Sequence, residues 1–315
     1  MALTYPEAVV VGLVQGVTEL FPVSSLGHSV LLPALVGGRW ARDLDVSAPE
    51  SPYLAFIVGL HVATAVALLV FFRADWVRVV RGALTSVRDR SVTTADQRLA
   101  WLIVLATLPV GVVGLLLEHT FRTVLGKPMP AAAFLVANGL ILLAGERLRR
   151  RVPAAVPAVR ETAPAGRAGA PDAPAPADLD GGVAADRRLA GVGTRTALFV
   201  GAAQVLALLP GISRSGSAMV AGLVRGLDHE DAARFSFLLA TPVILAAGVL
   251  KLPDLAGPLG DGVRGQVLVG SVVSGLAAYA SVRWLTRWFS TRTLTPFAVY
   301  SLLAGAGSLA VLAAR

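Results

Sequence analysis

Hydrophobic residues form six long stretches along the chain, and short polar loops separate them. Each stretch is long enough to cross a hydrocarbon core of about 30 Å as a helix. Several contain glycine or proline, which transmembrane helices accept more readily than soluble ones. The pattern therefore predicts six membrane-spanning helices, over Ser51 to Phe72, Leu99 to Leu117, Ala131 to Gly145, Phe235 to Leu252, Val267 to Leu285 and Thr295 to Ala314.

Two further apolar segments, Leu13 to Leu32 and Ala202 to Leu223, are interrupted by residues that end helices. Each predicts an apolar half-helix, a break at Pro22 or at Pro210-Gly211, and a second half-helix with a serine-rich start. The segments resemble each other at an offset of 189 residues, which aligns Gly12 with Gly201, Gln15 with Gln204, Leu20 with Leu209, Ser24 with Ser213 and Gly27 with Gly216. In so apolar a chain, this repeat predicts a buried polar site between two broken helices.

The composition agrees with a membrane protein. Hydrophobic residues make up 55% of the chain and charged residues only 15%, against about 25% charged residues in soluble domains. The start of the chain has no basic segment and no small-residue cleavage site, so we expect no removable signal peptide. Cysteine is absent, which excludes disulfides, thiolate metal sites and a cysteine nucleophile.

The basic residues are distributed unevenly among the loops. Of the 28 Lys and Arg, 20 lie in the ranges 73–98, 147–195, 225–234 and 283–292, and seven lie in the alternate loops and at the C-terminus. The positive-inside rule places the first group in the cytoplasm. We expect no nucleic-acid partner, because these arginines are spread over separate loops and interspersed with aspartates.

Each half of the chain contains one broken segment followed by three spans. If the broken segment enters and leaves the membrane on the same side, the three spans that follow place the start of the second half on the opposite side. The second half then has the inverted orientation in the membrane, and the charge distribution agrees. We therefore expect an all-α polytopic integral membrane protein of two inverted-topology repeats, each a re-entrant broken-helix segment plus three transmembrane helices. The expected domains are a first membrane repeat (1–150), a disordered Pro/Ala-rich cytoplasmic linker (151–190) and a second membrane repeat (191–315).

The first broken segment carries an acid, hydroxyls and an imidazole close together. Gln15 and Glu19 are four residues apart and share one helix face. A carboxylate at membrane depth is costly to keep, which favours function for Glu19, although a structural hydrogen bond to the broken backbone is the alternative. Ser24 or Ser25 can cap the second half-helix, whose positive end attracts phosphate. Most such serines are caps alone, but Glu19 and His28 add a base and an acid.

The second broken segment adds an arginine to the same cap geometry. Arg214 lies between Ser213 and Ser215, and a guanidinium binds phosphate with two parallel donors. A structural ion pair between Arg214 and Glu19 is the alternative. Glycines allow a ligand to approach the backbone closely, and three of them flank the breaks: Gly27, Gly211 and Gly216.

Other polar residues are less indicative of a site. His61, Asn138 and Gln204 are each isolated in apolar stretches, which is more typical of hydrogen bonds between helices than of ligand binding. His119 and His229 lie in loops, and we expect neither in the site.

The broken segments resemble the signature motifs of a known family. The runs Gln15-Gly-Val-Thr-Glu19-Leu-Phe-Pro-Val-Ser-Ser25-Leu-Gly-His28 and Pro210-Gly-Ile-Ser-Arg214-Ser-Gly216 are similar to those of the bacterial undecaprenyl-diphosphate phosphatases, the bacitracin-resistance membrane proteins. The resemblance covers almost the whole chain apart from the linker. It implies a bacterial plasma-membrane enzyme that converts undecaprenyl diphosphate to undecaprenyl phosphate, the carrier lipid of cell-wall synthesis, with a divalent cation, Mg²⁺ or Ca²⁺.

The resemblance also implies roles for individual residues. The implied catalytic residues are Ser25, His28, Glu19 and Arg214, with Ser25 as nucleophile and His28 as proton shuttle. The implied metal ligands are Glu19 and Gln15. Attack by a water that His28 or Glu19 activates is the alternative. Gln15 stands where glutamate is commoner in the family, which removes one carboxylate from the metal site. We expect the substrate to contact Ser24, Gly27, Gly211, Ser213, Ser215 and Gly216.

A transporter or flippase of a lipid-linked phosphate is the alternative from another functional class, because inverted repeats with broken helices are a transporter architecture. The Ser-x-x-His pattern beside an arginine and an acid favours phosphoryl transfer instead. The expected partners are a polyprenyl diphosphate lipid and the bilayer. A homodimer stays open, because the sequence does not set the oligomeric state.

Overall fold

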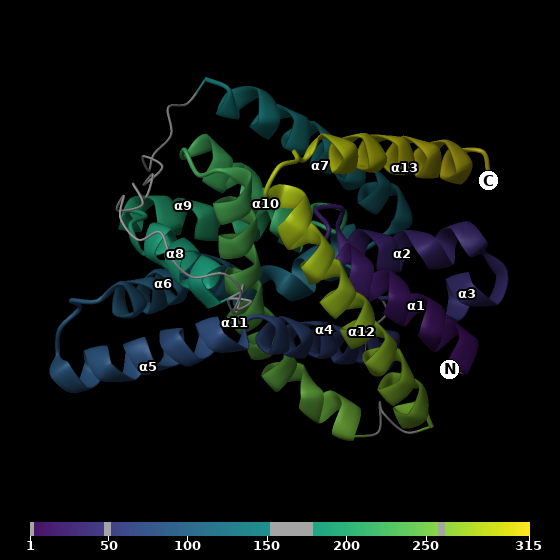
Figure 1. The fold of residues 1–315 in the computed structure, drawn as a ribbon. Coiled ribbons are helices and arrows are strands. Elements are labelled where there is room, and N and C mark those ends of the chain that lie inside the picture. Colours follow the sequence, from purple (N-terminus) through teal and green to yellow (C-terminus); the bar gives the residue numbers. More distant parts are fainter. Residues whose placement is uncertain (1–2, 47–51, 152–178, 258–261) are drawn as a thin grey trace, which may run out of the picture.

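The computed structural model describes residues 3–46, 52–151, 179–257 and 262–315, and this part of the chain is built of helices joined by short turns (Figure 1). In chain order the helices are α1 (Tyr5–Thr18), α2 (Ser25–Val36), α3 (Gly38–Asp43), α4 (Pro52–Phe71), α5 (Arg73–Asp89), α6 (Ala95–Leu125), α7 (Pro128–Arg149), α8 (Leu179–Ala190), α9 (Thr194–Ala203), η1 (Gln204–Leu208), α10 (Arg214–Val224), α11 (His229–Ala256), α12 (Arg264–Phe289) and α13 (Thr295–Ala313).

All six predicted membrane spans coincide with long helices. Five of them, α6, α7, α11, α12 and α13, are by themselves long and apolar enough to cross a membrane. The sixth, α4, meets the same test together with α5, to which it is joined by a bend of 88°. The sequence did not predict α5, because its arginines made this segment resemble a polar loop.

The helices of the two halves have matching packing partners. Helix α1 packs along α12, and its counterpart α9 packs along α6, while α4 contacts α11 and α7 contacts α13 (Figure 1). Both matching crossings depend on a glycine at an aligned position. A side chain at Gly12 would collide with the carbonyl of Gly270, and one at Gly201 with the carbonyl of Ala106. The two aligned glycines therefore serve the same purpose in each half.

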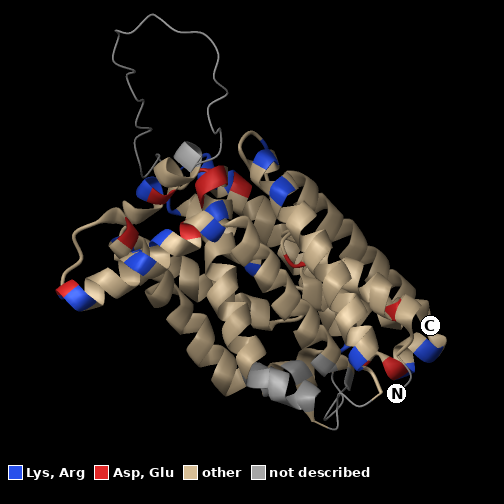
Figure 2. Cartoon of the chain, turned by 60° about the horizontal axis from the view of Figure 1, so that its bottom comes forward, with Lys and Arg blue, Asp and Glu red and all other residues tan. Residues whose placement is uncertain are grey.

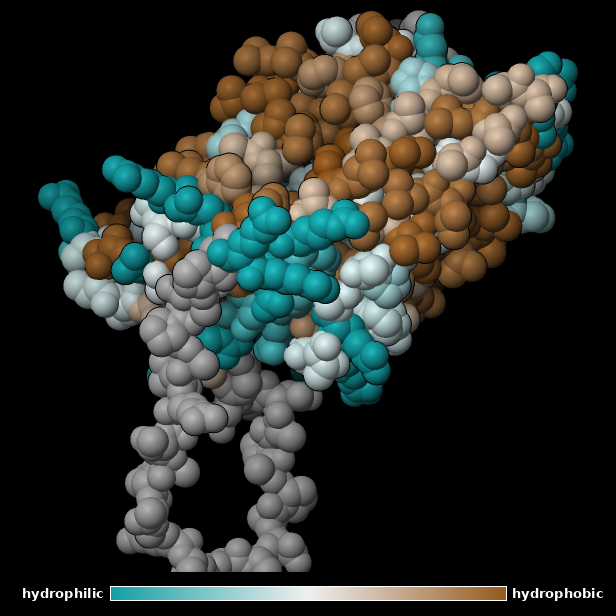
Figure 3. Space-filling view, turned by 90° about the horizontal axis from the view of Figure 1, so that it is seen from above, coloured by the Kyte–Doolittle hydropathy of each residue, from teal (hydrophilic) through white to brown (hydrophobic). Residues whose placement is uncertain are grey.

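The charged residues lie mainly at the two ends of the helix bundle. Figure 2 shows the N- and C-termini together at one end and most charged segments toward the other, with few between. In Figure 3, hydrophilic side chains gather on part of one face and hydrophobic ones cover the rest of it. This distribution is typical of a membrane protein whose middle is surrounded by lipid and whose two ends are exposed to water.

The predicted linker extends too far at its C-terminal end. Residues 152–178 lie outside the described residues, but Leu179–Ala190 forms helix α8. Asp186 of this helix is buried and accepts hydrogen bonds from Arg78 at 2.5 Å and Arg234 at 2.9 Å. The expectation of disorder to residue 190 is therefore wrong over α8, because ion pairs to α5 and α11 hold it.

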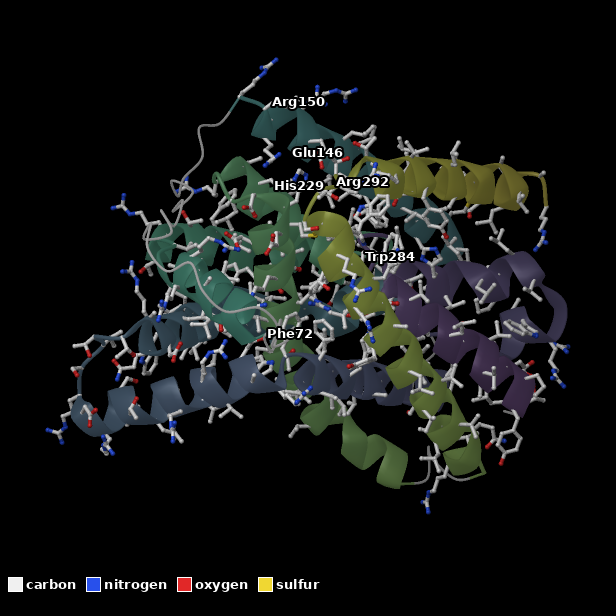
Figure 4. All side chains as sticks on the ribbon, viewed as in Figure 1. Phe72, Glu146, Arg150, His229, Trp284 and Arg292 are labelled. Atoms are coloured by element: carbon white, nitrogen blue, oxygen red, sulfur yellow. The ribbon has the colours of Figure 1, made fainter. Side chains whose placement is uncertain are left out.

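A second buried polar contact joins α7 to α11 near the same end. His229 Nε2 lies 2.7 Å from Glu146 Oε1, which also accepts a hydrogen bond from the backbone N–H of Leu294 at 2.6 Å (Figure 4). Glu146 thus links the starts of α11 and α13 to the end of α7. The expectation that His119 and His229 lie in loops is therefore wrong, because His229 is the first residue of α11, where it contacts Glu146, and His119 lies within α6.

Candidate active site

The first break in the helices places two serines at the start of α2. Helix α1 ends at Thr18, residues 19–23 form the turn, and α2 begins at Ser25. Ser24 caps α2, because its Oγ accepts a hydrogen bond from the N–H of Gly27 at 3.2 Å. Its φ is 69°, an uncommon value for a residue other than glycine, and such positions concentrate at functional sites.

The second break has the same form. Helix α9 continues into η1, and Gly211 turns the chain with a φ of 113°, which favours glycine. Ser213 Oγ then accepts a hydrogen bond from the N–H of Gly216 at 3.1 Å and caps α10, which begins at Arg214. The serine caps predicted from the sequence are therefore confirmed in both halves.

The two breaks contact each other directly. The N–H of Gly211 donates a hydrogen bond to Ser24 Oγ at 3.2 Å. Asn138 of α7 joins both breaks, because its Nδ2 donates to the carbonyl of Pro22 at 3.0 Å and its Oδ1 accepts from the N–H of Ser213 at 2.9 Å. The isolated asparagine thus makes the bonds between helices that its position predicted.

The carboxylate of Glu19 is the centre of the polar site and is almost fully buried. Its Oε1 accepts a hydrogen bond from Arg214 Nη2 at 2.5 Å. Its Oε2 accepts from Ser25 Oγ at 2.5 Å and from Gln15 Nε2 at 3.1 Å, and His61 Nε2 lies 3.1 Å away. The ion pair between Arg214 and Glu19, considered above as the structural alternative, is therefore present, and the nucleophile candidate shares the same carboxylate.

A cavity of about 240 Å³ opens beside this carboxylate. Its polar wall comes from the two breaks and includes Ser24, Ser25, Ser213 and Arg214. Its apolar wall comes from η1 and three long helices, with Val58, Val110, Leu208, Val243, Ile244, Ala247 and Gly248. A pocket with convergent polar groups at one side and hydrocarbon at the other fits a ligand with a charged head and an apolar tail.

Several buried polar atoms in or beside this cavity have no hydrogen-bond partner within the protein. Arg214 Nη1 and both polar atoms of the Gln204 side-chain amide belong to lining residues, and Gln15 Oε1 belongs to an amide that is hydrogen-bonded to Glu19. Leaving a buried donor or acceptor unpaired costs about 1–3 kcal/mol, and more for a charged group. Four such atoms in one place indicate that a polar ligand completes the site.

His28 is not turned toward the Glu19 carboxylate. Its Nδ1 donates a hydrogen bond to the carbonyl of Ser24 at 2.7 Å, and its Nε2 accepts one from the hydroxyl of Tyr300 at 2.7 Å. The two rings also stack, with centroids 5.8 Å apart. Both ring nitrogens of His28 are therefore occupied on the side of α2 that faces α13.

The remaining candidates for substrate binding divide into two groups. Ser213, like Ser24, lines the cavity, whereas Gly27, Gly211, Ser215 and Gly216 are not among the lining residues. Gly27 instead packs so closely on Gly211 that a Cβ would lie 2.9 Å from the Gly211 Cα. Ser215 Oγ lies 3.0 Å from Ser213 Oγ, so it can hydrogen-bond to the serine that caps α10.

Sequence reasoning missed two residues of this site. His61 and Gln204 both line the cavity, although isolation in apolar stretches favoured a structural role for each. Two signals were available. The cost of an ionisable group at membrane depth applies to His61 as it does to Glu19, and Gln204 aligns with Gln15 in the repeat.

Fold and site together define a multi-pass helical membrane protein with a buried polar cavity where two broken helices meet. A family model described as bacitracin resistance protein BacA matches residues 8–307, and the chain belongs to this family. The five apolar helices and the bacterial family make it a multi-pass protein of the bacterial inner membrane.

Relatives resemble the chain over nearly their full lengths. The undecaprenyl-diphosphatase of Mycolicibacterium paratuberculosis is 64% identical over 313 residues, which cover 99% of both chains. Undecaprenyl-diphosphatase 2 of Frankia alni is 60% identical over 334 residues, with 96% of each chain covered. Undecaprenyl-diphosphatase 2 of Chromobacterium violaceum is 40% identical over 303 residues, with 95% of each chain covered.

Proposed function

We propose that the chain is a membrane phosphatase that hydrolyses undecaprenyl diphosphate to undecaprenyl phosphate and inorganic phosphate, and so recycles the carrier lipid of cell-wall synthesis. The observation that carries this proposal is the Glu19 carboxylate, which holds the Ser25 hydroxyl and the Arg214 guanidinium at 2.5 Å each. Phosphoryl transfer needs such a positioned nucleophile, base and phosphate clamp. Relatives named undecaprenyl-diphosphatase over almost the whole chain support the substrate.

The membrane topology belongs to the proposal. We take the two halves as inverted repeats, which the matched glycine crossings and exchanged helix partners support. With the basic loops in the cytoplasm, α4 runs inward while α6 and α11 run outward. The cavity-lining residues of these helices then fall at their middles or in their outer parts: Val58, His61, Val110, Val243, Ile244, Ala247 and Gly248. The site would therefore open toward the outer leaflet.

Phosphate binding falls to the second broken segment. Arg214 Nη2 is engaged by Glu19, but Nη1 is buried and unpaired, so it can donate to a phosphate oxygen. The Gln204 amide supplies further unpaired atoms beside it. The N-termini of α2 and α10 add positive dipole ends. The prenyl tail would lie against the apolar wall and continue into lipid.

The chemistry falls to the first broken segment. Ser25 Oγ attacks the terminal phosphorus, and its proton passes to Glu19 Oε2, 2.5 Å away. The bond from that phosphorus to the bridging oxygen breaks, and undecaprenyl phosphate leaves. Water then attacks the phosphoserine and releases inorganic phosphate, which restores the serine. Glu19 here accepts the proton that the family resemblance gave to His28, because both nitrogens of His28 are bonded elsewhere. Direct attack by water, with Glu19 as base, is the alternative.

The residues of the site fit a divalent cation. Gln15 Oε1 is a buried oxygen without a partner, and it lies at the end of a side chain that touches Glu19 Oε2. These are the oxygen ligands that Mg²⁺ and Ca²⁺ prefer. When bound, the cation would neutralise charge on the diphosphate oxygens.

Phosphate release by the purified protein in detergent micelles tests this function. We expect one inorganic phosphate and one undecaprenyl phosphate for each undecaprenyl diphosphate consumed, and Glu19→Gln should abolish both products. A transporter or flippase cannot show activity without two compartments. Absence of release from folded wild-type protein, together with movement of the lipid across vesicles, would replace the phosphatase by a carrier.

A further inference from the structure

His61 belongs to α4, which is not part of either broken segment, and its side chain reaches the site from there. It lines the cavity, and its Nε2 lies 3.1 Å from Glu19 Oε2. Its other ring nitrogen, Nδ1, lies 2.8 Å from the carbonyl of Ile57. A carbonyl oxygen only accepts, so Nδ1 carries a proton and the ring orientation is fixed.

This hydrogen bond determines what Nε2 presents to the carboxylate. In the neutral ring, the proton on Nδ1 leaves a lone pair on Nε2, directed at an oxygen that also bears lone pairs. Two such atoms at 3.1 Å need a proton or a cation between them. A histidine that donates one ring N–H to a backbone carbonyl and offers the other nitrogen is the arrangement found at metal sites.

We infer that His61 Nε2 is a ligand of the divalent cation, together with Glu19 Oε2 and Gln15 Oε1, an inference that rests on the proposed function of this site. Among the described residues no three His, Cys, Asp or Glu side chains are arranged to hold a metal ion. The third donor that the structure offers is the amide of Gln15, whose Nε2 lies 3.1 Å from Glu19 Oε2 while its Oε1 is unpaired.

The spacing of these donors agrees with one coordination sphere. Neighbouring ligands of an octahedral ion with bonds of about 2.1 Å lie about 3 Å apart. Glu19 Oε2 lies 3.1 Å from His61 Nε2 and 3.1 Å from the Gln15 amide, while its third contact, at 2.5 Å, is the hydrogen bond from Ser25 Oγ. Turning the Gln15 amide about its last bond exchanges Nε2 for Oε1 at the same place, and the two ends are distinguished only by their bonding.

An imidazole ligand has a consequence for metal choice. Oxygen-only sites suit Mg²⁺, Ca²⁺ and Mn²⁺, whereas an imidazole ligand suits ions such as Fe²⁺, Ni²⁺ and Zn²⁺. The chain has glutamine at position 15 and so offers one carboxylate at this point. We therefore expect the site to bind Ni²⁺ and Zn²⁺ more tightly than Mg²⁺, with His61 responsible for the difference, and Mn²⁺ can serve as a paramagnetic probe of the same ligands.

Pulsed electron paramagnetic resonance of Mn²⁺ on the purified full-length protein in detergent tests this inference without using activity. A coordinated imidazole nitrogen modulates the electron spin echo. We expect nitrogen modulation in the wild type and its loss in His61→Gln, with Mn²⁺ binding weakened at least about tenfold, since even an outer partner of a ligand contributes 10–100-fold. The chain has four histidines, so the matched controls change the other three to glutamine: His28, His119 and His229.

The outcomes separate the ligand from the function. Modulation that survives in His61→Gln, or a wild type with bound Mn²⁺ and no modulation, would overturn the inference whatever the activity. His61→Asn, compared by thermal unfolding, guards against a variant that fails to fold. Phosphate release with Mn²⁺ in the absence of modulation would leave the phosphatase intact and remove His61. Modulation without release with any cation would keep the ligand and reject the phosphatase.

Discussion

Arg214→Lys tests whether the guanidinium does more than pair with Glu19. Nη2 donates to Glu19 Oε1 at 2.5 Å, while Nη1 is buried at the cavity without a partner. The planar fork can therefore hold the carboxylate and a phosphate oxygen together. A lysine keeps the charge, but its single ammonium on a flexible chain cannot reproduce both contacts in fixed geometry.

The expected loss follows from one charge-assisted hydrogen bond. Such a bond contributes about 1.5–3 kcal/mol, and each 1.36 kcal/mol is tenfold in rate. We therefore expect kcat/KM for undecaprenyl diphosphate to fall about 10–150-fold in Arg214→Lys, measured as phosphate release in detergent micelles. The thermal unfolding of the variant should change little, because Lys can still pair with Glu19.

Arg225→Lys is the matched control at the other end of α10. Arg225 is exposed, its donors reach the hydroxyl of Thr196 at 3.3 Å, and its guanidinium carbon lies 5.9 Å from the centroid of the Phe199 ring. This change should leave kcat/KM within about twofold, because surface substitutions have small effects. Turnover by Arg214→Lys that matches Arg225→Lys would mean that Arg214 acts only as the structural partner of Glu19.

Three further predictions concern the nucleophile, the topology and the linker. Ser25→Ala should lose nearly all turnover yet still bind a non-hydrolysable diphosphate. Ser24→Ala should reduce turnover less and should lower the stability of the protein by about 1 kcal/mol, the contribution of a helix cap. If both variants kept more than about a tenth of the wild-type rate, a covalent intermediate would be excluded. Cysteine at Asp45 should react with an impermeant thiol reagent in intact cells, and cysteine at Arg90 only after permeabilisation; the opposite pattern would invert the topology. Deletion of residues 154–177, a segment that ends before α8, should change the rate of phosphate release by no more than about twofold, because the entropy of loop closure depends only weakly on loop length. Complete loss of phosphate release in a folded deletion variant would show that this segment has a function.

The broken helices could be predicted because their determinants are local. Pro22 and Pro210-Gly211 end helices wherever they occur, and the serine that follows each caps the next helix within three residues. The spacing of Gln15 and Glu19 likewise places their side chains on one face of α1, and they are hydrogen-bonded in the structure. The repeat then indicates that the two breaks belong to one site.

The rest depends on contacts between distant parts of the chain. His61 lies in a helix that is apolar on every side, so no periodicity shows which face turns toward Glu19. His28 is drawn to α13 by Tyr300, 272 residues further along the chain. Helix α8 is held by ion pairs from Asp186 to α5 and α11, and composition alone carries no information about such pairs.

Hydrolysis in water enriched in ¹⁸O examines the proposed chemistry most directly, because it reports which phosphorus atom is attacked. Purified protein in detergent should release inorganic phosphate that carries one ¹⁸O for each bond broken, while the undecaprenyl phosphate carries none. The same result is expected whether Ser25 or water attacks first, and Glu19→Gln should suppress it. Label in the lipid phosphate, or release of intact pyrophosphate, would contradict transfer of the terminal phosphoryl group at this site.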